Sequence, residues 1–274
     1  MQRDITTLVS IKDKKFRIPT RNRTNNRLDT PLTNLNSMYR DNLLIDGNKP
    51  IYLDLSNSQF CLFSNMSLSI MFCSSSFKSS NNLIKSFCTL IRPLSERYRD
   101  KEDLKLFCKL ANEGKLYEGL KTKLGLKDRD EGKAIAFKLF FGNIQKEERV
   151  FEDSKKKALL REHFPTVVEI VELFKTHCIK KEKTSYEKNT DGYKLINLKK
   201  CYGQVGSSKF AIMLQNYESY IFIDEILQEL LDEGHLVLSI HDSFLFTDER
   251  VEKLIRIKLN QHLPHGHHLK SSYP

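Results

Sequence analysis

Residues 235–246 read His-Leu-Val-Leu-Ser-Ile-His-Asp-Ser-Phe-Leu-Phe, and the rest of the chain is interpreted around this stretch. An apolar, β-rich run is followed by His241 and Asp242 and then by apolar residues again. This pattern predicts two short strands joined by a tight turn, with the His-Asp pair at its tip. A lone His-Asp pair is more often an ordinary polar turn, so a functional interpretation needs a second carboxylate elsewhere.

A second carboxylate stands at Asp54, within residues 50–60, which read Pro-Ile-Tyr-Leu-Asp-Leu-Ser-Asn-Ser-Gln-Phe. Here too an apolar, strand-like run ends in an acid and small polar residues. Two strand-borne aspartates that meet can hold two divalent cations about 3.5–4 Å apart, as in enzymes that catalyse in-line displacement at phosphorus. Magnesium suits such a site because it takes hard oxygen ligands and keeps waters and substrate phosphates. We therefore expect Asp54 and Asp242 to be catalytic ligands of two Mg²⁺ ions, with Mn²⁺ as the alternative metal.

Residues 128–142 predict a helix that an aspartate caps and that Gly142 ends. Four side chains recur at every fourth residue and therefore share one face: Arg129, Lys133, Phe137 and Phe141. Two cations followed by two aromatic rings suit a helix that holds a triphosphate at its first turns and stacks on a base at its last. An amphipathic helix with solvated cations and buried phenylalanines explains the same pattern equally well.

The formal net charge of the 274 residues is +10, which favours a polyanionic partner, although basic proteins are common. The chain contains no apolar run of 18 residues, so no membrane span is expected. The N-terminus lacks a secretory pattern, and the six cysteines are scattered without a C-x-x-C pair. We expect an intracellular protein, either cytoplasmic or associated with an organelle or nucleoid.

These segments, in this order, resemble the palm and fingers of family A DNA polymerases and of the single-subunit phage and mitochondrial RNA polymerases. Asp54-x-Ser56 resembles the first catalytic motif, whose aspartate binds both magnesium ions. The four residues Arg129, Lys133, Phe137 and Phe141 are called the stripe below. Together with Gly142 they are similar to the nucleotide-binding helix of the fingers. His241-Asp242 resembles the last motif, where the histidine lies near the primer end and the aspartate is the second metal ligand.

The resemblance implies further roles. Arg129 and Lys133 would hold the incoming triphosphate, Lys133 would also protonate pyrophosphate, and the two phenylalanines would contact base and sugar. Gln59 stands where the DNA enzymes have the bulky residue that excludes a ribose 2′-hydroxyl, and Gln215 stands where a template-contacting glutamine is expected. Nucleic-acid contacts are expected from four arginines of the N-terminal region: Arg21, Arg23, Arg27 and Arg40.

The sequence also departs from the family pattern. Phe141 stands where both groups usually have tyrosine, and Ser243 replaces the glutamate that follows the aspartate in the DNA enzymes, as it does in the RNA enzymes. Gln59 and the short interval from Lys133 to Asp242 are closer to the DNA enzymes. A DNA polymerase is therefore favoured over an RNA polymerase, and the choice between deoxynucleoside and ribonucleoside triphosphates stays open.

The resemblance predicts an α+β fold, with a palm of antiparallel sheet and packed helices, helical fingers, and a thumb that is missing or minimal. A partner chain would then supply the thumb or processivity. Five segments are expected: a basic N-terminal segment over 1–30 (a disordered arm or a phosphate-contacting strand and loop), a first palm part over 31–100, fingers over 101–200, a second palm part over 201–262 with a helix at 214–234, and a flexible tail over 263–274.

The expected function is template-directed nucleotidyl transfer that extends a primer on a template with nucleoside triphosphates. One alternative is a non-catalytic nucleic-acid-binding relative that keeps the polymerase fold. A small metal-dependent nuclease would also use two aspartates, but it leaves the stripe of arginine, lysine and phenylalanines unexplained.

Overall fold

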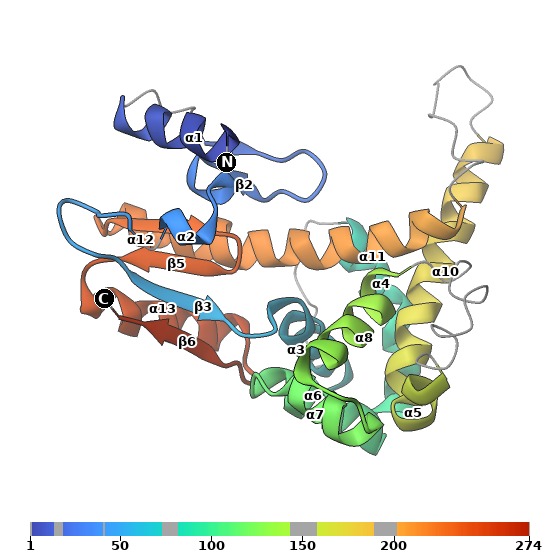
Figure 1. Ribbon diagram of the computed structural model, residues 1–274. Helices are drawn as coiled ribbons and strands as arrows, with labels where there is room; N and C mark the ends of the chain where they lie inside the picture. The colour runs from blue at the N-terminus through green and yellow to red at the C-terminus, as the bar shows by residue number, and fades with distance from the viewer. Residues whose placement is uncertain are drawn as a thin grey trace. The chain divides into compact units, whose positions relative to one another are not determined.

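The computed structural model describes residues 2–13, 19–40, 42–72, 82–142, 158–188 and 202–273. The chain divides into two compact units. The first unit combines Met1–Leu62 with Gln215–Pro274, and the second comprises Phe63–Leu214. The fold is α+β, mostly helical with small antiparallel sheets, which confirms the expected class (Figure 1).

The main sheet of the first unit has four antiparallel strands in the order β4-β5-β3-β6, which Figure 1 shows in part, with β5, β3 and β6 side by side. The bounds are β3 Ile51–Leu55, β4 Val237–Ile240, β5 Ser243–Phe246 and β6 Leu269–Ser272. Along β3 the apolar residues at 51, 53 and 55 are buried, whereas Tyr52 and Asp54 are half-buried on the opposite face. The alternation of apolar and polar residues therefore gives the sheet a core face and a second face that carries Asp54.

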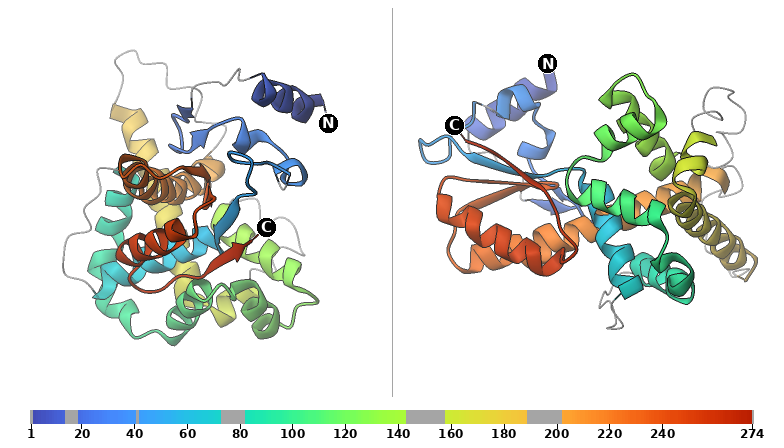
Figure 2. Two further views of the ribbon diagram at one scale, coloured as in Figure 1. Left: turned by 90° about the vertical axis from the view of Figure 1, so that its left-hand side faces the viewer. Right: turned by 90° about the horizontal axis from the view of Figure 1, so that it is seen from below.

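Helices cover the core face (Figure 2, right). They are α13 Glu249–His262 and the last part of a continuous helix, formed by α11 Tyr202–Ser219, the π-helix η5 Tyr220–Leu227 and α12 Gln228–Asp232. The rings of Phe222 and Phe244 stack with centroids 5.0 Å apart, which joins η5 to β5. The helix expected over 214–234 is present, but it begins twelve residues earlier than predicted, at Tyr202.

The N-terminal segment is structured rather than disordered over its described residues. It contains α1 Gln2–Lys12, the paired strands β1 Thr20–Arg21 and β2 Leu28–Asp29, η1 Leu32–Asn34 and α2 Ser37–Arg40. Of the two alternatives for this segment, the strand and loop is the one observed for residues 20–29.

The flexible tail expected over 263–274 is wrong for its described residues. Strand β6 pairs with β3, with Lys270 opposite Asp54 and Ser272 opposite Tyr52. The polar composition of this segment does not suggest a strand, because its polar side chains are satisfied by a residue distant in the sequence. Glu252 of α13 accepts hydrogen bonds from Ser271 Oγ (2.8 Å) and Tyr273 Oη (2.6 Å).

The second unit is helical in its described part. Its helices are α4 Asn82–Ile91, η2 Arg92–Leu94, α5 Ser95–Arg99, α6 Glu102–Asn112, α7 Leu116–Leu124, α8 Arg129–Phe141 and α10 Pro165–Lys188, together with most of α3 Ser58–Phe72. A core of phenylalanines surrounds Phe63, whose ring lies 5.0 Å from Phe140 and 6.1 Å from both Phe107 and Phe210. The helical unit therefore begins at Phe63, not near residue 101 as predicted.

Candidate active site

The two predicted acids lie in adjoining segments: Asp54 is in β3, and Asp242 is in the turn directly before β5. In the pairing of β3 with β5, Asp54 is opposite Ser243, the residue that follows Asp242. The backbone N–H of Leu55 donates to the carbonyl oxygen of Asp242 at 3.1 Å. The expectation that positions 54 and 242 become neighbours is thus confirmed, although 188 positions separate them in the sequence.

The backbone is unusual close to both acids. Asn57 has φ 54° and His241 has φ 56°, in the left-handed region that non-glycine residues rarely adopt. Asn57 lies where the chain leaves β3 for α3, and His241 lies in the turn between β4 and β5. Such conformations cost roughly 1–3 kcal/mol and gather at functional sites. The end of β3, with Asp54, and the start of β5, preceded by Asp242, lie at the same end of this strand pair.

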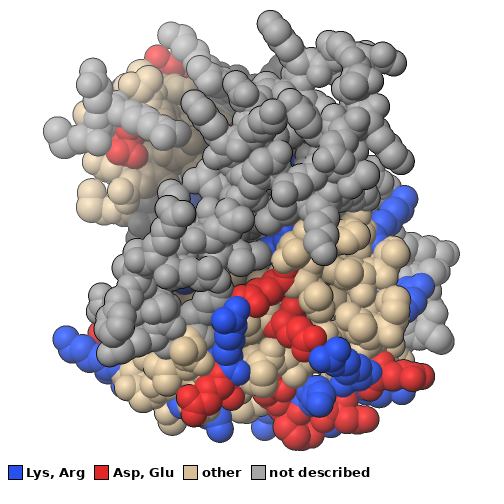
Figure 3. All heavy atoms as spheres, turned by 90° about the vertical axis from the view of Figure 1, so that its right-hand side faces the viewer, with Lys and Arg blue, Asp and Glu red and all other residues tan. Residues whose placement is uncertain are grey.

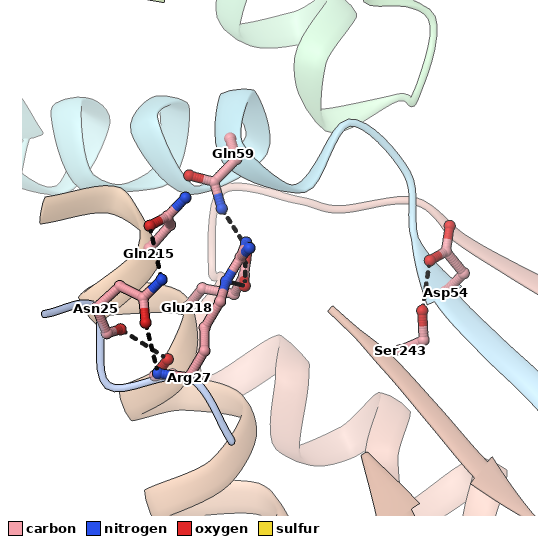
Figure 4. A network of polar contacts seen from close by, with 8 residues as sticks. Asn25, Arg27, Asp54, Gln59, Gln215, Glu218 and Ser243 are labelled. Carbon is pink, nitrogen blue, oxygen red and sulfur yellow. Dashed lines mark hydrogen bonds and ion pairs between the residues drawn. The ribbon is translucent and has the colours of Figure 1, made fainter. Parts of the chain in front are cut away.

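Asp54 is half-buried, and Ser243 Oγ donates a hydrogen bond of 2.6 Å to its Oδ1 (Figure 4). Burial raises the pKa of Asp54, and the charge of Asp242 raises it further; the Ser243 hydrogen bond and the charge of Lys270 act in the opposite direction without cancelling the rise. The site therefore holds two mutually repelling carboxylates, which a bound cation would stabilise.

The donor set fits magnesium. The described residues contain no group of three or more His, Cys, Asp or Glu side chains arranged around one metal position. Mg²⁺ does not need such a cage, because it is commonly bound by one or two carboxylates and completes its octahedron with water and substrate phosphates. Asp54 and Asp242 would be its protein ligands.

A third carboxylate, Glu218, was not predicted. Its side chain is 1% exposed, Arg27 Nε donates to its Oε1 at 2.8 Å, and Gln59 Nε2 donates to its Oε2 (Figure 4). Burial and the charge of Asp242 raise the pKa of Glu218 to about 8, against the effect of Arg27 and Gln59. The nearby Asp242 thus connects this buried ion pair electrostatically to the paired carboxylates.

The N-terminal hairpin is held on the helix that carries Glu218. Asn25 Nδ2 donates to Gln215 Oε1 at 3.1 Å, Ser219 Oγ donates to the carbonyl of Asn25 at 3.2 Å, and Arg21 forms an ion pair with Asp224 of the π-helix. π-helical turns are rare and frequent at functional sites. This one begins two residues after Glu218.

Two of the four arginines that were predicted to contact nucleic acid are paired with carboxylates of the protein. Arg21 and Arg27 are engaged with carboxylates of their own unit, whereas Arg23 is exposed in the hairpin turn. Arg40 is half-buried, and its carbonyl accepts a hydrogen bond from Tyr52 Oη at 2.9 Å. Gln215, predicted to contact template, already accepts a hydrogen bond from the hairpin.

His241 is half-buried, and its Nδ1 is buried without a hydrogen-bond partner among the described residues. Burial lowers the pKa of this histidine, and the charges of Arg27 and Arg40 lower it further against the opposing effect of Asp242. The imidazole is therefore neutral at pH 7, so it can accept or donate a hydrogen bond beside Asp242.

The predicted stripe lies on α8 of the second unit. Asp128 caps the helix by accepting from the N–H of Glu131 at 2.8 Å. Lys133 Nζ lies 5.9 Å from the centroid of the Phe137 ring, which is 39% exposed and lies 5.2 Å from the Phe141 ring. The first phenylalanine is thus not the buried core residue of the plain amphipathic alternative.

Arg129, at the start of the stripe, is engaged locally. Its Nε donates to Glu118 Oε1 at 2.6 Å, and its guanidinium lies 4.9 Å from the centroid of the Tyr117 ring. Both partners belong to α7. A role in phosphate binding would require this exposed ion pair to exchange for a phosphate contact.

The other end of α8 is held by a buried lysine. Lys175 is 2% exposed, and its Nζ donates to the carbonyl oxygens of Leu139 (2.6 Å) and Gly142 (2.9 Å). The Leu139 carbonyl lies in the last turn of the helix and the Gly142 carbonyl directly follows it. At such a helix end the acceptors lack intrahelical partners and the helix dipole favours a cation. Lys175 therefore fixes the point at which the stripe ends.

Lys and Arg are interspersed with Asp and Glu on the described surface that faces the viewer in Figure 3. Ion pairs such as Arg97–Glu169 (3.0 Å) and Arg161–Glu172 (3.0 Å) occur within the second unit. In the described part of the chain, every helix is too short or too polar to cross a bilayer.

Fold and site together define an α+β protein with two neighbouring carboxylates where two inner strands of an antiparallel sheet end. Neither the protein-family models nor the curated proteins contain a match to the sequence.

Proposed function

We propose that the chain is a template-directed nucleotidyltransferase that extends a nucleic-acid primer. The observation that carries the proposal is the meeting of Asp54 in β3 with Asp242 in the turn directly before β5. It supports the resemblance to the polymerase palm, because that resemblance requires two acids far apart in sequence to become neighbours. The first unit would be the palm, and the second unit would be the fingers.

Asp54 and Asp242 would hold two divalent cations. When bound, Mg²⁺ activates the primer 3′-hydroxyl and stabilises the charge on departing pyrophosphate. Ser243 would hold the Asp54 carboxylate in one orientation through its 2.6 Å hydrogen bond. The remaining lone pairs of the acid would then be available to the metal. Neutral His241 lies beside Asp242 and would contact the primer terminus.

Lys133, Phe137 and Phe141 would contact the incoming nucleotide. The lysine would neutralise triphosphate charge and supply a proton to pyrophosphate. The exposed Phe137 ring and its neighbour Phe141 offer apolar surface for base and sugar. Arg129 would join them after exchanging Glu118 for phosphate.

Gln59 would lie beside the sugar, with its amide held by Glu218. Of the four arginines, Arg23 and Arg40 would contact the nucleic-acid backbone directly. Arg21 and Arg27 would instead fix the hairpin that carries Arg23. The partners are thus a primer–template and nucleoside triphosphates, with a thumb supplied by another chain.

The decisive experiment is extension of a labelled primer on a template with Mg²⁺, run in parallel with deoxynucleoside and ribonucleoside triphosphates. A polymerase lengthens the primer, and the better substrate identifies the sugar. Shortening of the strand would identify a nuclease instead.

The second candidate is a non-catalytic nucleic-acid-binding relative. The observation that favours it is the engagement of Arg129 with Glu118 and Tyr117, which leaves the first position of the stripe occupied within the protein. In the same assay a binder would retard the primer in a native gel without lengthening it.

A further inference from the structure

The C-terminal strand places a lysine directly beside the first acid of the site. In the pairing of β3 with β6, Lys270 is opposite Asp54. Opposite residues of an antiparallel pair point to the same face of the sheet, with Cβ atoms about 4.5–5.5 Å apart. On the other side of Asp54 stands Ser243. Ser243, Asp54 and Lys270 thus form a row across three strands on one face.

The position of this lysine is fixed by two nearby residues, Ser271 in β6 and Tyr273 directly after the strand. Ser271 and Tyr273 both donate hydrogen bonds to Glu252, which belongs to α13 on the core side of the sheet. Arg256 also contacts Ser271 Oγ, at 2.9 Å. Because successive residues of a strand alternate between faces, this anchoring turns Lys270 toward the Asp54 face.

The charge of Lys270 is available to a ligand. The side chain is exposed, and within the described residues its ammonium forms no ion pair or hydrogen bond. Its charge acts to lower the pKa of the Asp54 carboxyl, in agreement with the register that places the two residues opposite each other. A four-carbon stem with three rotatable donors can reach from the strand to a neighbouring oxyanion.

We propose that Lys270 binds a phosphate group of the substrate at the paired-carboxylate site. The inference rests on the proposed function, since metal-bound carboxylates bring substrate phosphates next to them. The two acids repel a polyanionic substrate, and the positive charge of Lys270 in the same row reduces this repulsion. The phosphate belongs either to the nucleic-acid strand or to the triphosphate, and the chemistry of recognition is the same.

A lysine on an edge strand can have a simpler role, because such residues block edge-to-edge pairing between copies of a chain. Strand β6 is an edge of the sheet as described. That role would affect association of the protein and not its affinity for phosphate, so the two explanations are separable.

The test compares Lys270→Gln, Lys270→Arg and the control Lys253→Gln. Lys253 is an exposed lysine of α13 in the same unit, so its replacement removes the same charge away from the Asp54 face. Binding of a fluorescent primer–template duplex is measured by anisotropy in EDTA over a range of salt concentrations. The KM of the triphosphate and kcat are measured in Mg²⁺, and thermal unfolding and sedimentation verify each variant.

If the phosphate is in the strand, Lys270→Gln weakens duplex binding about threefold to tenfold and lowers the logarithmic salt slope by about 0.9, the value for one phosphate contact. If it is in the triphosphate, duplex binding stays unchanged and KM rises about threefold to tenfold at constant kcat. In either case Lys270→Arg restores the loss and Lys253→Gln shows none.

Wild-type values for Lys270→Gln in both measurements would overturn the inference while leaving the polymerase proposal intact, provided that the wild-type protein extends primers. If the wild-type protein neither binds the duplex nor extends it, the polymerase proposal fails and the inference fails with it.

Discussion

Arg27 and Glu218 form an ion pair across 191 positions of the sequence, with Arg27 Nη2 2.7 Å from Glu218 Oε1. The glutamate is buried, whereas the arginine side chain is 22% exposed. This pair joins the N-terminal hairpin to the helix behind the paired carboxylates. It is one of several contacts between this hairpin and that helix, together with Asn25–Gln215 and Arg21–Asp224.

Removal of the arginine alone should be costly. At pH 9, above the Glu218 pKa of about 8, Arg27→Met leaves a buried carboxylate without its cation, and we expect a loss of about 3 kcal/mol in the free energy of unfolding. The double variant Arg27→Met/Glu218→Gln should recover much of that loss, since no uncompensated charge remains. Urea denaturation of the four members of this cycle measures the coupling. The control Arg23→Met, in the same hairpin, should be close to neutral; an equal loss in that variant would contradict the assignment.

Glu218 should make stability depend on pH. Its pKa is about 8 in the folded protein against an ordinary value of 4.5, so the folded state binds more protons between these values. The contribution of Glu218 is then fully present below pH 4.5 and is lost as pH rises toward 8. Comparison of wild type with Glu218→Gln by urea denaturation at pH 5 and pH 8 isolates it. The variant should show a smaller decline with pH, and an unchanged decline would count against the buried, perturbed carboxyl.

Ser243→Ala removes the hydrogen bond to Asp54 Oδ1. Loss of a group that orients a metal ligand typically costs about 10-fold to 100-fold in metal affinity or activity. We expect the Mg²⁺ concentration for half-maximal extension to rise about 10-fold. The control is Ser239→Ala, a buried serine of β4 whose hydroxyl has no hydrogen-bond partner among the described residues. Equal metal requirements in the two variants would show that Ser243 does not orient the acid.

Lys175→Met should destabilise the second unit. The substitution keeps the length of the side chain but leaves the carbonyls of Leu139 and Gly142 without their cation. We expect a loss of about 2 kcal/mol in the free energy of unfolding, because hydrogen bonds to charged groups are among the stronger ones. Lys123→Met, at an exposed position of α7, is the control. A Lys175 variant as stable as this control would mean that the two contacts contribute little.

Sequence patterns within one segment correctly predicted the hairpin of β4 and β5 and the helix α8. The hairpin of β4 and β5 follows from two apolar runs around a polar turn, and α8 follows from its aspartate cap and terminal glycine. The neighbouring position of Asp54 and Asp242 depends on tertiary pairing and was expected only through the proposed chemistry.

Helix α3 was missed because its polar residues are buried with partners that are distant in sequence. Ser64 Oγ donates to the carbonyl of Cys108, and Asn65 Nδ2 donates to Asn112 Oδ1. A Ser/Asn-rich composition therefore suggested no regular element. Strand β6 was missed for a similar reason, since its polar residues bind Glu252.

Glu218 gave no distinct signal, because it stands next to the polar residues Gln215, Asn216 and Ser219 of the predicted helix. Its partners Arg27 and Gln59 could not have been identified from the sequence. Lys270 gave no signal, because only the register of β6 against β3 brings it beside Asp54.

The most direct test of the central claim uses the two acids themselves. Asp54→Asn and Asp242→Asn preserve the size of each side chain and remove the negative charge that a divalent metal needs. Primer extension in Mg²⁺ and duplex binding in EDTA are measured for both variants and for Asp232→Asn, an exposed aspartate of α12 in the same unit. We predict that both site variants lose extension while binding the duplex as the wild type does, and that the control retains both. Undiminished synthesis by either site variant would contradict the assignment of Asp54 and Asp242 as the metal-binding pair.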